Sequence, residues 1–363
     1  MLSIPLLRHV KRKWPEQPLI LVCRKGLGSF FLKNKLVDEV FELDKKDAVS
    51  SENFYSFISS YKIDHLFCPH QSFRSAWMLK SIRANKKITF ARWWNKSFFD
   101  IRVKRNTDLP EALRVLQLLA PVDTHLAERL EKLRLDKSYY NSSKRSTIAS
   151  WPHQISTDLS LLVEPDVALV HDVTSKFKLQ RPYAVIAPAS QWATKRWSSS
   201  GFSELVHLLS ERALNVYIVG APSEASYCKE IEHLAAASAG RVDVRSLAGE
   251  TDLLSLHALL SHAEVVVAND SGPMHMAVAA GRPVVGIFGP TTLDLGFRPW
   301  SELSYIAQVD LPCRPCGRHG HNVCPIKTHD CMKKISAHDV IEGVDLLRRK
   351  APVAGSISPS QTY

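Results

Sequence analysis

The stretch from Val265 to Thr291 holds residues whose order suggests an anion-binding site. A β-rich run ends at Asn269, and Asp270-Ser271-Gly272-Pro273 then form a turn that opens a helical stretch. Proline suits the first helical position, because its missing N–H would have no partner there. Such a turn leaves backbone N–H groups free at the positive end of a helix, where phosphate binds. The alternative is that Asp270 and Ser271 only cap the helix.

A second loop with suitable chemistry follows the apolar run Tyr183–Ala187. It contains Ser190, Thr194, Lys195 and Arg196, directly after an expected buried strand. Hydroxyl groups and a lysine in that position can bind phosphate oxygens. A solvated surface loop would also explain the two basic residues, and we expect the nearby tryptophans to form a hydrophobic clasp.

Three further side chains could complete a nucleotide site. Met274 and His275 lie in the first turn after the Asp270 turn, so both can face the same ligand. Glu224 follows the expected strand Asn215–Val219, and a carboxylate there can accept hydrogen bonds from ribose hydroxyls. The alternative for Glu224 is a favourable charge in the first turn of a helix.

The elements that carry these loops alternate between short β-rich runs and helical stretches, which predicts α/β architecture with parallel sheets. We expect strands at Leu19–Cys23, His65–Cys68, Tyr183–Ala187, Asn215–Val219, Glu264–Ala268 and Val284–Phe288, and helices at Leu109–Leu119, from Gly201, near Ser223, from Pro273, and from a Ser336 cap to Arg349. Residues 141–150 should form a surface loop, and residues 151–180 are ambiguous.

Charge divides the chain unevenly. Residues 1–150 contain 28 lysines and arginines against 15 aspartates and glutamates, a balance of +13, whereas the remainder has 19 against 21. A field of that size attracts polyanions such as phosphorylated saccharides or anionic lipid headgroups. A solvated basic surface remains the alternative. We do not expect nucleic acid as a partner, because the basic half lacks a base-stacking or groove-binding motif.

The cysteines and the start of the chain bear on its compartment. An apolar stretch, Met1–Val10, precedes the basic residues, which is the reverse of a signal peptide, so we expect a cytoplasmic protein with reduced thiols. Cys23, Cys68 and Cys228 are expected in the core. Four other cysteines could bind structural zinc or stay as packed thiols, namely Cys313, Cys316, Cys324 and Cys331.

These motifs together resemble glycosyltransferase family 9, the heptosyltransferases. The resemblance rests on NDSGPMHMAVAAGRPVVGIFGPT, on Lys195-Arg196-Trp197, and on Ser246–Gly249 followed by Thr251, and it runs from Leu2 to about Val344. It implies a GT-B fold, with two Rossmann-like domains whose parallel sheets face each other across a cleft. It also implies an ADP-heptose donor and an inverting transfer with neither metal ion nor cofactor.

The resemblance assigns boundaries and roles. The acceptor-side domain would span residues 1–170 and the nucleotide-sugar domain residues 178–335. The residues themselves predict the last helix at 336–350, after the Ser336 cap, and a disordered Ser/Pro-rich tail at 351–363. Lys195 would stabilise the leaving phosphate. The donor residues would be Ser190, Thr194, Lys195, Glu224, Leu247, Ala248, Gly249, Asp270, Ser271, Gly272, Met274 and His275, and the acceptor residues His70, Arg74 and Ser75.

The implied acceptor is the lipopolysaccharide inner core, whose carboxylates and phosphates suit the basic first half. We therefore expect peripheral contact with the inner face of the cytoplasmic membrane. Transfer of another nucleotide-activated sugar is the alternative within the family.

One departure from the family concerns the general base. The family opens with a strand and a Gly-Asp turn before a helix that matches Leu2–Trp14, and its base is that aspartate. No residue of this sequence occupies the position, so the base is unassigned. We expect a first sheet that lacks one strand, and either an upstream start or an impaired, sugar-nucleotide-binding protein.

Overall fold

The computed structural model describes residues 1–44, 46–133, 155–236 and 240–350. The loop expected at 141–150 and the tail expected at 351–363 lie outside these ranges. The chain divides into two compact units. The first unit contains residues 2–135, and the second contains residue 1 with residues 136–363.

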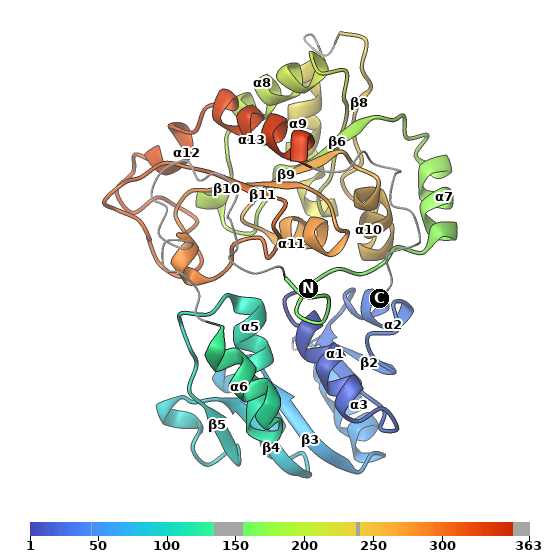
Figure 1. Ribbon diagram of the computed structural model, residues 1–363, viewed down its shortest axis with the longest axis vertical. Coiled ribbons are helices and arrows are strands. Elements are labelled where there is room, and N and C mark those ends of the chain that lie inside the picture. The colour runs from blue at the N-terminus through green and yellow to red at the C-terminus, as the bar shows by residue number, and fades with distance from the viewer. Residues whose placement is uncertain (45, 134–154, 237–239, 351–363) are drawn as a thin grey trace. The chain divides into compact units, whose positions relative to one another are not determined.

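The second unit is built on one six-stranded parallel sheet with the order β11-β10-β9-β6-β7-β8. Counted along the chain, this is the 3-2-1-4-5-6 order of a doubly wound nucleotide-binding fold. Its strand order reverses between β6 and β9, which pair directly (Figure 1). The strands are β6 (Tyr183–Ala187), β7 (Asn215–Ile218), β8 (Val244–Ser246), β9 (Val265–Asn269), β10 (Val284–Phe288) and β11 (Ser304–Gln308).

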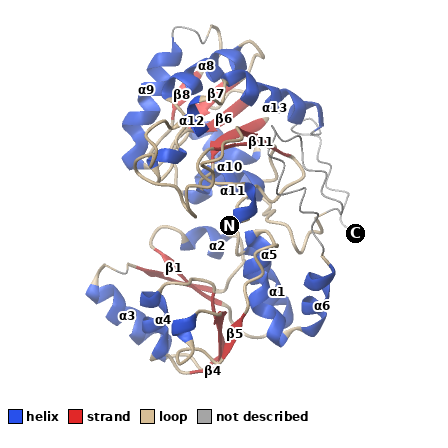
Figure 2. Ribbon diagram, turned by 90° about the vertical axis from the view of Figure 1, so that its left-hand side faces the viewer, coloured by secondary structure: helices blue, strands red, loops and turns tan. Residues whose placement is uncertain are grey.

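Helices cover both faces of this sheet, as doubly wound topology requires. In Figure 2, α8, α9 and α13 lie on one side of the strands, and α10 and α11 lie on the other. Every residue of β6, β9, β10 and β11 is buried. The helices are α7 (Val167–Lys176), α8 (Ser199–Ser210), α9 (Ala225–Ala236), α10 (Leu253–Ser261), α11 (Gly272–Ala279), α12 (Asp330–Lys333) and α13 (Ala337–Lys350).

The described residues of the first unit form five strands in two separate parallel sheets, β1-β2 and β3-β4-β5. Among the described residues, no pairing links β1 to β3. The strands are β1 (Ile20–Arg24), β2 (Glu39–Leu43), β3 (Ile63–Cys68), β4 (Ala84–Phe90) and β5 (Ile101–Val103). The helices are α1 (Ile4–Lys13), α2 (Gly28–Lys33), α3 (Ala48–Ser59), α4 (Phe73–Lys80), α5 (Glu111–Leu116) and α6 (Thr124–Lys132).

Most expected elements are present, with shifted ends. The strand Tyr183–Ala187 is confirmed at both ends, and Ser336 caps α13 as predicted, since its Oγ accepts from the Asp339 N–H at 3.1 Å. The helix expected at Leu109–Leu119 is shorter: α5 ends at Leu116 and continues as a 3₁₀ turn. The ambiguous stretch 151–180 contains α7, which packs against α10 in the second unit.

Across the described ranges, no helix combines the length and the apolar character that crossing a bilayer demands.

The two units should differ in local stability, because their strands differ in burial. No residue of β1 is fully buried, whereas β6 and β9 are buried throughout. Openings that expose few apolar contacts cost less free energy than global unfolding. Native-state hydrogen exchange should therefore find the β1 and β2 amides exchanging well before those of β6 and β9. Equal protection in both units would contradict this expectation.

Candidate functional site

Two of the chemically suggestive loops meet at the point where the strand order of the second unit reverses. The loop after β6 carries Ser190 to Lys195, and the turn after β9 carries Asp270 to Gly272. Asn269 fastens the two segments together, because its Nδ2 donates to the carbonyl of Pro188 at 2.6 Å and its Oδ1 accepts from the Trp197 N–H at 3.3 Å. Ligands of doubly wound sheets bind at this switch point, beyond the carboxyl ends of the strands.

A buried ion pair lies at the centre of this junction. The Lys195 Nζ is 2.5 Å from Asp270 Oδ2, and the Thr291 hydroxyl donates to the same oxygen at 2.7 Å. Lys195 and Asp270 are 8% and 6% exposed. The Asp270 side chain is thus held by two partners within the protein, and it fixes the ammonium group at the switch point. What the turn offers to a ligand is its backbone.

The backbone N–H groups at the start of α11 are accessible to a ligand. Ser271 occupies the N-cap position of α11, but its side chain makes no capping bond and instead donates to the carbonyl of Asn269 at 3.1 Å. The capping alternative is therefore wrong for the side chains of this turn. A Cβ added at Gly272 would meet no atom within 4 Å, so the approach to the first turn is unobstructed. First-turn N–H groups without a side-chain cap form an anion site.

The two side chains expected beside this turn lie in different surroundings. Met274 is fully buried, and its Sδ lies next to Gly286 of β10, so it packs in the core. The prediction that Met274 contacts the donor is therefore wrong, because its side chain is enclosed by the core. His275 is half-buried, and burial lowers the pKa of its imidazole to about 4 despite the nearby Asp270. The ring is neutral at neutral pH, and its Nδ1 has no hydrogen-bond partner in the described residues.

Thr194 has a different role from the one predicted. Its hydroxyl donates to the carbonyl of His321 and accepts from the His321 N–H, both at 2.8 Å. The single hydroxyl proton is thereby committed, which leaves none for a phosphate. His329 Nε2 contacts the Thr194 carbonyl at 2.7 Å. Thr194 fastens the Lys195 loop to the cysteine-rich segment, and Ser190 is buried beside it, with its carbonyl accepting from Arg196 Nε at 2.8 Å.

Sequence reasoning missed the histidines of the cysteine-rich segment as parts of this site. In the structure, His319 lies close enough to Lys195 to be influenced by its charge: burial, with Arg318 and Lys195, lowers the pKa of His319. The signal in the sequence was the density of histidines, which did not by itself say what they contact.

The cysteines of that segment do not gather metal ligands. Among the described residues, no group of three or more histidine, cysteine, aspartate or glutamate side chains is arranged to hold an ion. All four are free thiols, and Cys316 Sγ donates to the carbonyl of Cys313 at 3.1 Å. Burial raises the pKa of Cys331 to about 11, so this thiol stays protonated at neutral pH.

The loops after β7 and β8 lie together on one side of the switch point. The Gly249 N–H donates to the carbonyl of Gly220 at 2.9 Å, and Leu247 is buried. Gly249 has a φ of +84° and comes close to Pro222, two constraints that favour glycine. Ala248 continues the same loop. The Glu224 carboxylate accepts from the Ala221 N–H at 2.8 Å, so it caps its own turn.

In the first unit, the predicted acceptor residues gather at the start of α4. Ser72 is the N-cap and accepts from the Ser75 N–H at 3.2 Å. His70 Nδ1 is 2.8 Å from the Ser75 hydroxyl, which is buried. Ser75 therefore has a structural role in the cap, whereas Arg74 and His70 are exposed.

The buried pair should dominate the stability of the second unit. Asp270→Asn would leave the Lys195 ammonium buried without its countercharge, which costs about 3–5 kcal/mol. Chemical denaturation measures the change in the free energy of unfolding. The control is Lys334→Met, which breaks the largely exposed pair with Asp330 (2.9 Å) and should cost less than about 1 kcal/mol. Equal effects would show that burial gives the Lys195 pair no special weight.

The sequence of this chain is similar to those of known heptosyltransferases. The family described as glycosyltransferase family 9 (heptosyltransferase) matches residues 58–326. Lipooligosaccharide heptosyltransferase 2 of Campylobacter jejuni is 33% identical over 156 residues, which cover 42% of this chain and 47% of that protein. The chain thus spans about half the length of that relative. Lipopolysaccharide heptosyltransferase 3 of Escherichia coli is 23% identical over 316 residues, or 83% of each chain.

Solved structures show the same fold. The Escherichia coli ADP-heptose lipopolysaccharide heptosyltransferase II superposes with a TM-score of 0.71 at 19% identity, covering 96% of this chain and 95% of that one. A family 9 glycosyltransferase from Veillonella parvula superposes with a TM-score of 0.73 at 16% identity, covering 96% and 94%. The fold is therefore GT-B, α/β with parallel sheets, and the chain belongs to glycosyltransferase family 9, the heptosyltransferase family.

Proposed function

We propose that this protein transfers heptose from ADP-heptose to the inner core of lipopolysaccharide, with inversion at the anomeric carbon and without a divalent metal ion. The observation that carries the proposal is that the Lys195 ammonium, held by Asp270, and the uncapped N-terminus of α11 lie together at the switch point of the sheet in the second unit. Both features attract the same ligand group, a diphosphate. The names of the family relatives supply the sugar and the acceptor.

The donor would extend from this point across the neighbouring loops. With the diphosphate over Gly272 and Lys195, the nucleoside falls toward the loops after β7 and β8, which lie side by side. Leu247, Ala248 and Gly249 would line the adenine, and Glu224 would accept from the ribose hydroxyls. The neutral imidazole of His275, with an unpartnered Nδ1, can hydrogen-bond the donor without adding charge.

The same groups would assist the chemical step. When the acceptor hydroxyl attacks the anomeric carbon, the bond to the ADP oxygen breaks and negative charge grows on the leaving phosphate. The Lys195 ammonium is fixed beforehand by Asp270, whose carboxylate is held in turn by Thr291, and the first-turn N–H groups of α11 lie beside it. Preorganised positive groups of this kind stabilise the transition state more than the ground state. The proton of the hydroxyl passes to a general base.

The acceptor would be recruited by the basic first half. Residues 1–150 have a balance of +13, from 28 basic and 15 acidic residues. A phosphorylated core saccharide is a polyanion, and its lipid anchor implies reaction at the inner face of the cytoplasmic membrane. Exposed Arg74 and His70, at the start of α4, are the proposed contacts with that saccharide.

ADP titration tests the donor site. Lys195→Ala should weaken ADP binding by about 1.5–3 kcal/mol, because a hydrogen bond between charged groups is lost. Adenosine, which lacks the phosphates, should bind the variant and the parent protein about equally. Lys229→Ala, an exposed lysine of the same unit, should leave ADP affinity unchanged. Equal loss of adenosine binding would point to a misfolded site instead, and loss of affinity on adding a chelator would contradict a metal-free site.

Transfer itself is measured with ADP-heptose and lipopolysaccharide core lacking the last heptose. Arg74→Ala should impair use of the acceptor and leave ADP affinity alone, because Arg74 and the donor loops belong to different units. An acceptor dependence identical to that of the parent protein would remove Arg74 from the acceptor site.

A further inference from the structure

We infer that an exposed aromatic surface of the first unit is the part of the protein that docks on an anionic lipid bilayer. This surface, called the aromatic surface below, consists of Phe73, Trp77, Trp93, Trp94 and Phe98. The inference deepens the proposed function, since a lipid-anchored acceptor requires the enzyme to work at a membrane. It assigns that contact to particular side chains.

Four of the rings, those of Phe73, Trp77, Trp94 and Phe98, form one continuous cluster, and Trp93 directly precedes Trp94 in the chain. Phe73 lies 6.0 Å from Trp77, 5.5 Å from Trp94 and 6.0 Å from Phe98, measured between ring centroids. Phe98 also contacts Trp77 at 6.3 Å and Trp94 at 6.4 Å. Yet Phe73 is 55% exposed, Trp77 58% and Trp93 91%. Gathered exposed aromatic rings mark an interaction surface, whereas single exposed apolar residues are ordinary.

The backbone is built to present these side chains. Trp93 and Trp94 stand on a 3₁₀ turn, Trp93–Asn95, directly after β4. The buried Asn95 fixes that turn, because its Nδ2 donates to the carbonyl of Phe90 at 2.9 Å and its Oδ1 accepts from the Arg92 N–H at 3.0 Å. Trp93 is therefore held outward by a well-bonded turn.

The charge around the aromatic surface selects an anionic partner. Residues 73–105 contain ten lysines and arginines and one acidic residue, Asp100. That carboxylate is already engaged, since it accepts from the Lys87 N–H at 2.7 Å. Lys80 lies over the rings of Trp77 and Phe98, at 5.3 and 5.6 Å from their centroids. Tryptophan and lysine side chains together are the residues that anchor proteins at the interface of a bilayer.

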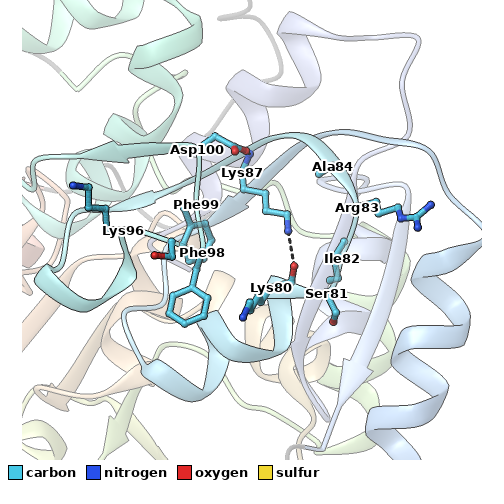
Figure 3. A pocket seen from close by; sticks show the side chains of 11 residues that line it. Lys80, Ser81, Ile82, Arg83, Ala84, Lys87, Lys96, Phe98, Phe99 and Asp100 are labelled. Carbon is cyan, nitrogen blue, oxygen red and sulfur yellow. Dashed lines mark hydrogen bonds between the residues drawn. The ribbon is translucent and has the colours of Figure 1, made fainter.

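A basic hollow adjoins the rings. It has a volume of about 490 Å³, and its lining includes Lys80, Arg83, Lys96 and Phe98. Figure 3 shows Lys87 reaching across to the carbonyl of Lys80, with the ring of Phe98 beside Lys80. A lipid phosphate could enter among these ammonium groups while the rings insert between neighbouring headgroups.

Ring geometry favours a bilayer over single-stranded nucleic acid. Phe73 packs edge-on against Trp94 and Phe98, at interplanar angles of 64° and 85°. Bases stack on ring faces that are free and follow one another along a strand. Phe73, Trp77, Trp94 and Phe98 instead pack against one another, which makes a compact apolar surface. The same helix α4 begins with the proposed acceptor contacts, so a membrane-bound acceptor and the docking surface would be continuous.

The experiment is co-sedimentation of the full chain with vesicles of phosphatidylcholine alone or mixed in equal amounts with phosphatidylglycerol. We expect binding to the mixed vesicles, little to the neutral ones, and a fall with salt as the Debye length shrinks from about 10 Å to about 3 Å. Trp93→Ala should weaken binding roughly tenfold if its ring is buried in the interface. Because Trp93 is almost fully exposed, the substitution should not affect folding.

Leu234→Ala, an exposed apolar residue on α9 of the second unit, is the matched control and should bind vesicles like the parent protein. Trp93→Ala should keep its ADP affinity and its transfer to a deacylated core saccharide, while losing transfer to acceptor embedded in vesicles. If the parent protein bound vesicles but no ADP, the proposed function would fail and the docking surface would stand. Unchanged vesicle binding by Trp93→Ala, or tighter binding to a single-stranded oligonucleotide than to the mixed vesicles, would overturn the inference.

Discussion

The ion pair between Lys195 and Asp270 fixes the geometry of the proposed donor site in the second unit. A buried lysine is tolerated only when an opposite charge and hydrogen bonds offset the loss of hydration. Asp270 supplies that charge from the end of β9, and Thr291, following β10, supplies a hydrogen bond to the same carboxylate. Three neighbouring strands of the sheet are therefore tied at their carboxyl ends by one carboxylate. The ammonium group is held in place before any ligand arrives, and the N-terminus of α11 opens beside it.

Much of this could be read from the sequence, because the second unit obeys simple rules. Its strands are buried on both faces and so appear as uninterrupted apolar runs, which is why Tyr183–Ala187 and Val284–Phe288 are predicted at their true ends. The proline of the Asp-Ser-Gly-Pro turn predicts the start of a helix, and α11 begins there. The first unit was harder to predict, since β2, β4 and β5 are half-buried, and charged residues such as Glu42 and Lys87 interrupt their patterns.

Side-chain roles were less predictable than elements, because they depend on contacts between distant segments. Thr194 resembled a phosphate ligand, but its hydroxyl is satisfied by His321, 127 residues away. Met274 was expected to face a ligand, but the rotation of α11 directs it onto Gly286. The aromatic surface was missed because Phe73 and Trp77 lie on α4, whereas Trp94 and Phe98 lie in the loop between β4 and β5. Trp197, for which a hydrophobic clasp with the other tryptophan of its loop was expected, lies in the core, and its indole N–H donates to the carbonyl of Ile335 at 3.0 Å.

The long sequence separations within the site bear on how the protein is made. Lys195 meets Asp270 across 75 residues, and Thr194 meets His321 across 127. Contacts between residues so far apart in the sequence form late in folding, because other native contacts must first offset the entropy cost of closing the loop between them. A growing chain that has just completed β6 and α8 exposes a lysine with no countercharge and a sheet with most of its strands still to come. The donor loop reaches its final form only once the cysteine-rich segment has been synthesised and packed, so a nascent chain would need protection from aggregation until that segment has been made.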